Sequence, residues 1–545
     1  MYRHLHTISM DLGDKEFHIA PMIDVSTVEF RYFIRLLTKR AVIWNQMVVA
    51  ETLVYRSQRH EQNLLSKEIA SCELDSSSTS CNGRDKKNSD NDVELTSDLE
   101  KFCGWYDDSQ VSGVDPHPIV CQLGSNIPSE AAFATRIAQK CGYDAIDLNS
   151  ECPSDRVAGR CFGAALIKQP DTAVNVVSAM VSNTNLPVSV KTRIGVDDHS
   201  SFEYIASYIK RLVEEAGCKH FIIHARKVYL EGLNPVENRT IPPLNYPIVY
   251  RLCHHFPDCS FIINGGIRGL EMAREVSYGS KIEFDESGIG RRKEINIHDN
   301  SDTSDTDDHD VPCQRCNLPQ GSCLMPPLIA PQNLQGVMVG RLARDRPADL
   351  HDIDRYYYGE KTNPCSNRRE LMEKYISFLE RVYPRRCCDD DETVTLGMVK
   401  DMPHVIKPER QYCEICQEFR GQTDYDTSVI ISQNTNLDLA STKSNTMAQT
   451  KQSGRRSKRH MKYEDCKIVS RIIDRALAPT HSILNGVKGK KSFLQTAHKL
   501  SRDQAVRNCG PGFILYKAMQ SVPTSIWDEP FELSGGMRST YYPSK

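Results

Sequence analysis

Eight short apolar segments constrain the fold of this chain more than any other feature of its sequence. Runs of about four to eight apolar residues between polar stretches are typical of buried strands. Several of the intervening stretches have the spacing of amphipathic helices. The eight candidate strands begin at Phe17, Ala41, Pro118, Tyr143, Pro187, His220, Cys259 and Gln335. Because strands that alternate with helices favour a parallel sheet, this pattern predicts a closed (β/α)₈ barrel.

A doubly wound open sheet is the alternative fold for the same alternation. When such a sheet binds a dinucleotide, a glycine-rich turn follows its first strand. Here the first strand ends in Ala20-Pro21-Met22, without glycine. The barrel is therefore the preferred prediction.

Long polar segments interrupt the pattern and divide the barrel. They cannot bury enough apolar surface to order themselves, so we predict disordered insertions. The predicted barrel comprises residues 1–65, 118–278 and 334–360, and the predicted insertions are residues 66–117, 279–333 and 385–462.

The C-terminal part has helical spacing and no further strand candidates. The pattern predicts a small all-helical domain formed by residues 361–384 and 463–525, with residues 526–545 as a tail. This domain is locally basic, which suits contacts with nucleic-acid phosphates but also suits a solvated helical face. Its basic residues are Lys488, Lys490, Lys491, Lys499, Arg502 and Arg507.

Composition excludes several classes of protein. The net charge of −3 indicates no nucleic-acid partner for the molecule as a whole, so any basic surface is local. No apolar run approaches the roughly 20 residues that span a bilayer, and residues 1–16 lack the apolar core of a signal peptide. The 20 cysteines are scattered, which favours reduced thiols and a cytoplasmic location, with an organelle as the alternative.

Two strand ends carry glycines. Asn264-Gly265-Gly266 ends the seventh strand and Gly340-Arg341 ends the eighth. In such barrels the loops after these strands commonly bind phosphate, through backbone N–H groups and a guanidinium. The simpler interpretation is that these glycines only turn the chain. We prefer a phosphate site because both segments lie at the expected ends.

Polar side chains end four other strands. Gln122, Cys152, Lys191 and His224 follow the third, fourth, fifth and sixth apolar runs, so each should face the mouth of the barrel. Lys191 and His224 beside a phosphate site predict an anionic planar cofactor, and the amide of Gln122 suits a heterocycle edge. The alternatives are a solvated lysine, a histidine with its hydrogen bonds satisfied and a cysteine that is one more buried apolar residue.

Taken together, these motifs are similar to those of the tRNA-dihydrouridine synthases, most closely the A-type members. The resemblance covers nearly all predicted ordered segments between Phe17 and Arg355. The motifs are Ala20-Pro21-Met22, Gln122-Leu123-Gly124, Asn149 with Cys152-Pro153-Ser154, Val190 to Gly195, Ile222 to Lys227, Pro242 to Pro247, Asn264-Gly265-Gly266 and Val339-Gly340-Arg341.

The resemblance implies an FMN-containing barrel that uses NADPH to reduce the C5–C6 double bond of uridine in tRNA, in the D-loop around the twentieth nucleotide. Cys152 would be the general acid that protonates C5 while C6 receives hydride. Asn149, Arg226 and Lys227 would hold the tRNA. The residues implied to bind FMN are Pro21, Met22, Ile23, Gln122, Lys191, His224, Asn264, Gly265, Gly266, Gly340 and Arg341.

Two other functions stay open at this point: a tRNA-binding relative with impaired catalysis, and an FMN barrel reductase that acts on a small molecule. We expect a monomer without an obligate protein partner and without a metal site. Two Cys-x-x-Cys pairs, at 313/316 and 413/416, have zinc-like spacing but no clear partner pair. The basic segment 455–459 suits a nuclear signal or an RNA tether, but a solvated linker is the preferred interpretation.

The chain departs from the A-type pattern at two positions. Ser150-Glu151 precedes the cysteine where Val-Gly is usual, and Gln46 stands where an acidic residue is usual. A carboxylate at Glu151 should raise the pKa of the neighbouring thiol.

Overall fold

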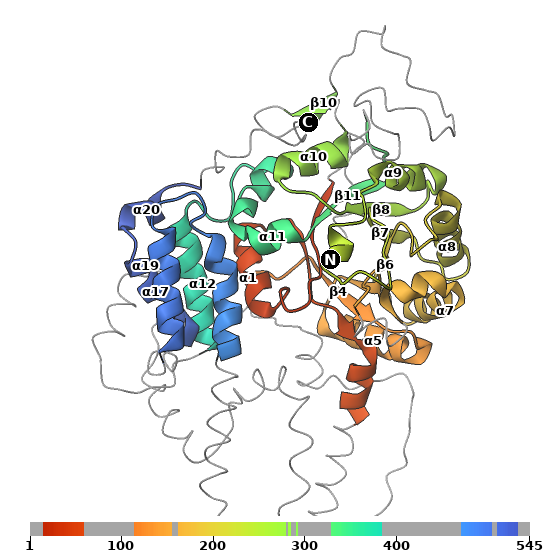
Figure 1. Ribbon diagram of the computed structural model, residues 1–545, viewed down its shortest axis with the longest axis horizontal. Helices are drawn as coiled ribbons and strands as arrows, with labels where there is room; N and C mark the ends of the chain where they lie inside the picture. Colours follow the sequence, from red (N-terminus) through yellow and green to blue (C-terminus); the bar gives the residue numbers. More distant parts are fainter. Residues whose placement is uncertain are drawn as a thin grey trace, which may run out of the picture.

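The computed structural model describes residues 15–58, 114–154, 162–279, 329–383, 470–503 and 510–531, and the backbone of two short strands between them. In Figure 1 the barrel and the helical domain lie side by side. Most of the three predicted insertions, both Cys-x-x-Cys pairs and the basic segment 455–459 fall outside the described residues.

The sheet is a closed parallel barrel, which confirms the predicted (β/α)₈ fold. Its order runs β2-β1-β11-β8-β7-β6-β5-β4, and pairing of β2 with β4 closes the ring. The open-sheet alternative is wrong because Ile43 pairs with Ile119 across this closure. The strands are β1 (Glu16–Ile19), β2 (Val42–Trp44), β4 (Ile119–Gly124), β5 (Ala145–Ser150), β6 (Val188–Arg193), β7 (His220–His224), β8 (Ser260–Asn264) and β11 (Leu334–Val339).

The sequence pattern predicts one strand from Ala41 to Val49, but the structure interrupts it. After β2, residues 45–47 leave the strand, and β3 (Val48–Val49) then pairs with the far end of β4. The side-chain oxygen of Asn45 accepts a hydrogen bond from the backbone N–H of Gln122 at 2.8 Å. The side-chain oxygen of Gln46 accepts one from the N–H of Asp24 at 3.1 Å, so Gln46 ties this break to the loop after β1.

Helices cover the outside of the barrel. The bounds are α1 (Val28–Leu37), α5 (Pro128–Cys141), α7 (Pro170–Val181), α8 (Phe202–Glu214), α9 (Tyr246–His255), α10 (Leu270–Tyr278) and α11 (Arg341–Asp345). The sequence pattern predicts one helix from 164 to 181, which is wrong. A 3₁₀ helix, η2 (Gly163–Lys168), comes first, and Pro170 begins α7 because proline lacks the N–H that a continuous helix needs there.

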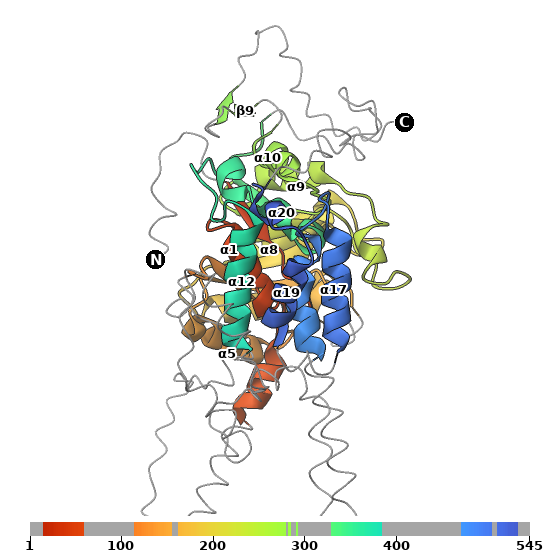
Figure 2. The ribbon, with the colours of Figure 1, turned by 90° about the vertical axis from the view of Figure 1, so that its left-hand side faces the viewer.

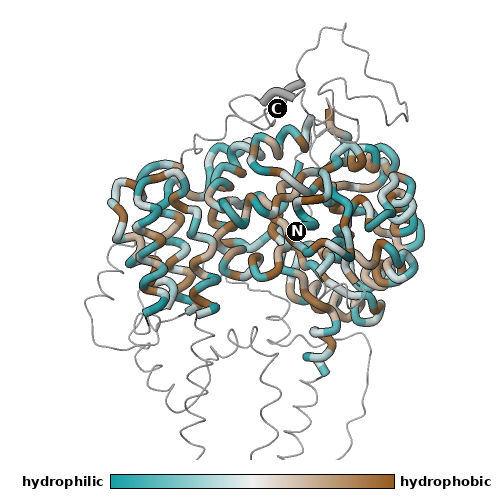
Figure 3. Tube along the Cα trace, in the orientation of Figure 1, coloured by the Kyte–Doolittle hydropathy of each residue, from teal (hydrophilic) through white to brown (hydrophobic). Residues whose placement is uncertain are grey.

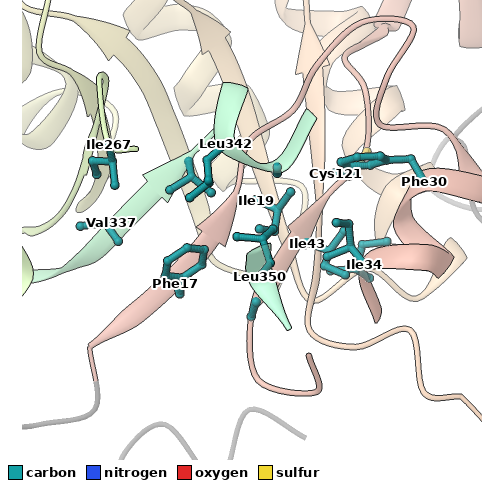
Figure 4. Packing of buried hydrophobic residues seen from close by; sticks show 14 of the residues in the cluster. Phe17, Ile19, Phe30, Ile34, Ile43, Cys121, Ile267, Val337, Leu342 and Leu350 are labelled. Carbon is teal, nitrogen blue, oxygen red and sulfur yellow. The ribbon is translucent and has the colours of Figure 1, made fainter. Parts of the chain in front are cut away.

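Alternation along the strands separates two apolar cores. Phe17 and Ile19 of β1 belong to the outer core together with Phe30 and Ile34 of α1. Figure 4 shows Phe30 beside Cys121 and Ile34 beside Ile43. Ala20 and Trp44 point inward. The buried members of the inner cluster are Ala20, Trp44, Val120, Ile222, Ile262 and Met338. The inner cluster fills the barrel at mid-height, so the polar strand ends lie above an apolar plug. In Figure 3 hydrophobic and hydrophilic turns alternate along the outer helices.

The helical domain packs against α1 of the barrel. Its elements are α12 (Arg368–Val382), helical residues 470–477, η9 (Ala478–Ser482), α17 (Lys490–Arg502), α19 (Gly510–Gln520) and α20 (Thr524–Asp528). The rings of Tyr32 and Phe378 stack at 3.8 Å, and Arg475 lies 3.2 Å from the buried carboxylate of Glu29. Figure 2 shows α12, α17 and α19 running side by side.

A short antiparallel ribbon lies within the range 279–333, for which the sequence predicts disorder. It pairs β9 (Ile282–Phe284) with β10 (Gly290–Arg292).

Gly336 of β11 provides a test of barrel closure. A Cβ at this position would lie 1.9 Å from the carbonyl oxygen of Glu16 on the paired strand β1. We therefore expect Gly336→Ala to lower the free energy of unfolding by about 1–3 kcal/mol or more in urea denaturation. Gly269→Ala is the control, because no atom lies within 4 Å of its Cβ position. Equal stability of the two variants would contradict the close approach of β1 and β11.

Candidate active site

The mouth of the barrel carries a ring of inward polar side chains. Gln122, Asn149, Lys191, His224 and Asn264 end the five consecutive strands β4 to β8, and all are buried. The side-chain N–H₂ of Asn149 donates to the side-chain oxygen of Gln122 at 3.0 Å, and the ammonium of Lys191 donates to that of Asn264 at 3.4 Å. The structure thus brings together residues that the sequence places up to 142 positions apart, from Gln122 to Asn264.

Asp147 supports this ring from below and was not predicted. Its carboxyl group accepts hydrogen bonds from the amide of Gln122 at 2.8 Å and from the hydroxyl of Ser189 at 2.7 Å. Burial raises the pKa of Asp147 to about 8 despite these hydrogen bonds. The available signal was its position two residues before Asn149, because alternate residues of a strand face the same side.

Asn149 orients the loop that carries the cysteine. Its side-chain oxygen accepts hydrogen bonds from the backbone N–H groups of Glu151 at 3.3 Å and of Cys152 at 3.1 Å. This is the Asx arrangement by which an asparagine shapes a turn. The carbonyl of Cys152 accepts a further hydrogen bond from the N–H of Ala164 at 3.0 Å. Both the oxygen and the nitrogen of the Asn149 amide are therefore hydrogen-bonded within the protein.

The Cys152 thiol lies at the edge of the mouth and is partly buried. Burial raises the pKa of this thiol, and the negative charge of Glu151 raises it further. The effect of Glu151 has the expected direction but is smaller than that of burial. A thiol with a raised pKa stays protonated at neutral pH, as a proton donor must.

Glu151 also makes contacts that the sequence analysis did not anticipate. Its carboxylate forms an ion pair with the ammonium of Lys191 and lies 3.4 Å from Nδ1 of His224. Burial opposes ionisation of Glu151, but the charge of Lys191 and the neighbouring imidazole hold its pKa well below the ordinary value. Burial lowers the pKa of His224 to about 3, with a contribution from Arg193, so this imidazole is neutral at physiological pH.

The glycine turn after β8 has no room for side chains. Gly265 and Gly266 have φ values of 118° and 71°, in the region that favours glycine. A Cβ on Gly266 would lie 2.3 Å from a methyl group of Leu244, and one on Gly265 would lie 2.9 Å from the ring of His224. The turn therefore requires glycine for conformation and for space, whatever ligand it holds.

Arginines gather beside this turn. Burial lowers the pKa of Arg341, and the nearby Arg268, Arg239 and Arg344 lower it further. Burial, followed by the charge of Arg341, lowers the pKa of Arg226 to about 10. A bound anion would offset the repulsion between these guanidinium groups. Arg341 and Arg226 were predicted from the motifs, whereas Arg239, Arg268 and Arg344 were not.

The remaining predicted residues lie around the mouth with defined contacts. The guanidinium of Arg226 donates to the carbonyl groups of Thr240 and Pro242, and the ammonium of Lys227 lies 4.5 Å from the ring centre of Tyr229. A Cβ on Gly340 would lie 3.7 Å from the sulfur of Met22, so the eighth strand end adjoins the loop after β1.

That loop is fixed by Ser26. Its hydroxyl donates to the carbonyl of Ala20 at 3.2 Å and accepts from the N–H of Met22 at 3.0 Å. Pro21 is partly buried, whereas Ile23 is 48% exposed.

The described part of the chain holds neither a metal-binding cluster nor a membrane-spanning helix. It contains no group of three or more side chains arranged to hold a metal ion. None of its helices combines the length and the apolar character needed to cross a membrane.

Comparison with known proteins gives the family. Residues 105–280 match the family model described as dihydrouridine synthase (Dus). The chain is 35% identical over 367 residues to the tRNA-dihydrouridine(20/20a) synthase of Shewanella oneidensis. The aligned region covers 67% of this chain and 78% of that protein. The protein of the same name from Pasteurella multocida is 32% identical over 67% of this chain and 80% of its own length. The chain belongs to the dihydrouridine synthase family. This confirms the resemblance drawn from the motifs.

The acidity of Cys152 provides a test of the electrostatics in this dihydrouridine synthase. Iodoacetamide alkylates the thiolate, and mass spectrometry of the Cys152 peptide gives the alkylation rate. As pH rises, this rate should reach half its maximum at a pH above the ordinary thiol pKa of about 8.5. Glu151→Gln should move this midpoint to lower pH, because it removes a negative charge next to the thiol and frees the positive charge of Lys191. A midpoint that stays in place would contradict the influence of Glu151.

Proposed function

We propose that this protein reduces the C5–C6 double bond of uridine to dihydrouridine in the D-loop of tRNA, around the twentieth nucleotide, with FMN as cofactor and NADPH as reductant. The observation that carries the proposal is the Cys152 thiol, whose pKa is raised and which lies at the mouth beside a ring of polar strand ends. The family and the printed names of the relatives support tRNA as the substrate.

The residues around the mouth fit FMN. An arginine cluster whose members repel one another lies next to the tight turn at Gly265 and Gly266, which suits a phosphate group. With Gly340, these residues would hold the phosphate. Gln122, Lys191, His224 and Asn264 would contact the ring, with the loop from Pro21 to Ile23 beside it. Bound FMN would supply the hydride for C6 of uridine.

The protein's own residues would carry the proton and the charge. The Cys152 thiol would donate its proton to C5, since its raised pKa keeps it protonated at neutral pH. Lys191 would stabilise negative charge on the ring edge. His224, with a pKa of about 3, would act as a neutral hydrogen-bonding group and not as an acid.

The tRNA would contact both domains. The exposed side chains of Lys488, Lys491, Lys499 and Arg502 form a basic surface on and before α17, which suits phosphate contacts. Arg507 lies outside the described residues. At the mouth, Arg226 and Lys227 would adjoin the substrate. Asn149 would act on it through the loop that it shapes, because its amide is hydrogen-bonded within the protein. The target uridine would leave the stack to reach the thiol.

The thiol provides the first test of the proposed chemistry. We expect Cys152→Ala to keep flavin absorbance and its bleaching by NADPH, but to reoxidise with unmodified tRNA at least about 10²-fold more slowly, because the general acid is lost. The readouts are stopped-flow absorbance and dihydrouridine content of the tRNA. Cys152→Ser controls for side-chain volume and should stay slow, because a hydroxyl is a poor acid.

Three outcomes would decide against parts of the proposal. Unchanged tRNA turnover in Cys152→Ala would remove the thiol from the mechanism. Colourless wild-type protein that still binds tRNA would favour a catalytically impaired relative. Flavin reoxidation by a small molecule but not by tRNA would favour another barrel reductase.

Arg341 provides a test of the phosphate site. We expect Arg341→Gln to weaken binding of FMN by about tenfold or more while leaving binding of riboflavin, which lacks the phosphate, nearly unchanged. Fluorescence titration measures both. Arg211→Gln is the matched control, because Arg211 lies on α8, outside the arginine cluster, and is paired with Asp171 at 2.7 Å. Equal losses for FMN and riboflavin would place the phosphate elsewhere.

A further inference from the structure

Glu151 places a carboxylate inside the mouth of the barrel. Its side chain is 18% exposed and that of its partner Lys191 is 2% exposed. The pair therefore lies largely out of water, where attraction between opposite charges is much stronger than at the surface. Glu151 comes from the loop after β5, whereas Lys191 and His224 come from the next two strands, β6 and β7, so the carboxylate lies over the two neighbouring strand ends.

Glu151 neutralises the positive charge in the ring of strand ends. Among the five ring residues, Gln122, Asn149 and Asn264 are uncharged amides and His224 is neutral, so Lys191 supplies the ring's ammonium. Arg193, also on β6, donates to the carbonyl of Asn238 at 3.0 Å. An electron-rich ligand that approaches Lys191 therefore meets an ammonium that already has an anionic partner.

Lys191 does not depend on Glu151 for its position. Its backbone pairs with Asn149 on β5 and Ile222 on β7, and its ammonium also donates to Asn264. The backbone of Glu151 is held by Asn149, so rotation of the Glu151 side chain would free Lys191 without moving the loop. The pair can thus be exchanged for another partner at small structural cost.

We propose that Glu151 is an internal competitor of the flavin ring: its carboxylate occupies the site on Lys191 that the electron-rich edge of the ring needs, and so it sets the affinity for the cofactor. This inference rests on the proposed function. It makes Glu151 a residue that tunes cofactor occupancy and the charge available to the bound ring, in addition to its effect on the thiol.

The opposite role would be that Glu151 positions Lys191 for the cofactor. The two roles predict changes of opposite sign. If Glu151 competes, its removal leaves a buried ammonium without its anion in the free protein, and the flavin then relieves that cost on binding. If Glu151 positions Lys191, its removal weakens flavin binding.

The experiment measures flavin affinity of the full-length apoprotein by quenching of flavin fluorescence. We expect Glu151→Gln and Glu151→Ala to bind FMN about tenfold more tightly than the wild type, the factor that corresponds to removal of one competing charged hydrogen bond. Riboflavin should gain by the same factor, since the competition concerns the ring and not the phosphate. The rise in melting temperature on adding FMN should also be larger in the variants.

Two further variants test whether the effect on flavin binding is specific to the pair of Glu151 and Lys191. In a Lys191→Met background, Glu151→Gln should no longer tighten flavin binding, because the group for which they compete is absent. Glu214→Gln, on the outside of α8 with a 63% exposed side chain, should bind flavin like the wild type. Melting temperatures of the apoproteins show that every variant is folded.

The outcomes separate this inference from the proposed function. Flavin binding that is unchanged or weaker in Glu151→Gln overturns the inference and leaves the proposed function standing. Tightening that persists in the Lys191→Met background overturns the assignment of the competition to Lys191. Absence of flavin binding in the wild type and in both Glu151 variants overturns the proposed function and the inference with it.

Discussion

Closure of the parallel sheet between β2 and β4 is the constraint on which the rest of the structure depends. Once Ile43 pairs with Ile119, each of the eight barrel strands has a neighbour on both sides, and their inward side chains converge on one axis. The apolar inner cluster around Trp44 and Met338 then fills the middle of the barrel. Polar groups remain at its mouth, where loops leave room for a ligand.

Burial makes the electrostatics of this mouth strong. The same low exposure raises the pKa values of Asp147 and Cys152, lowers that of His224 and strengthens the ion pair between Glu151 and Lys191. Burial removes each polar group from water and so disfavours its charged form, unless a partner of opposite charge compensates. A thiol that stays protonated and a lysine whose charge is shared are two consequences of one environment.

The helical domain lies beside the barrel and carries the exposed basic side chains on and before α17. Its attachment is specific: Glu29 of α1, buried at the interface, contacts both Arg475 and Tyr383, and Tyr32 stacks on Phe378. A buried carboxylate with two partners fixes one orientation, because any other would leave its charge unpaired. The proposed contact of tRNA with both domains depends on this fixed relation.

Sequence alone determined the barrel, because apolar runs of strand length and the helices between them are properties of neighbouring residues. It also located the strand ends, and with them Gln122, Lys191, His224 and the two glycine segments, since a polar residue after an apolar run marks the mouth. The sequence did not predict features that depend on contacts with distant residues. These are the break at Asn45, the separate 3₁₀ helix before Pro170 and the inward position of Asp147.

Only the tertiary structure decided which of these groups interact. Asn149 is adjacent in sequence to the loop that it shapes, yet its partner Gln122 lies on another strand. From the sequence, Glu151 is a neighbour of the thiol alone, but pairing of β5 with β6 brings it to Lys191, 40 residues further along the chain. Ion pairs between strands depend on distances in space, which a linear pattern of residues does not contain.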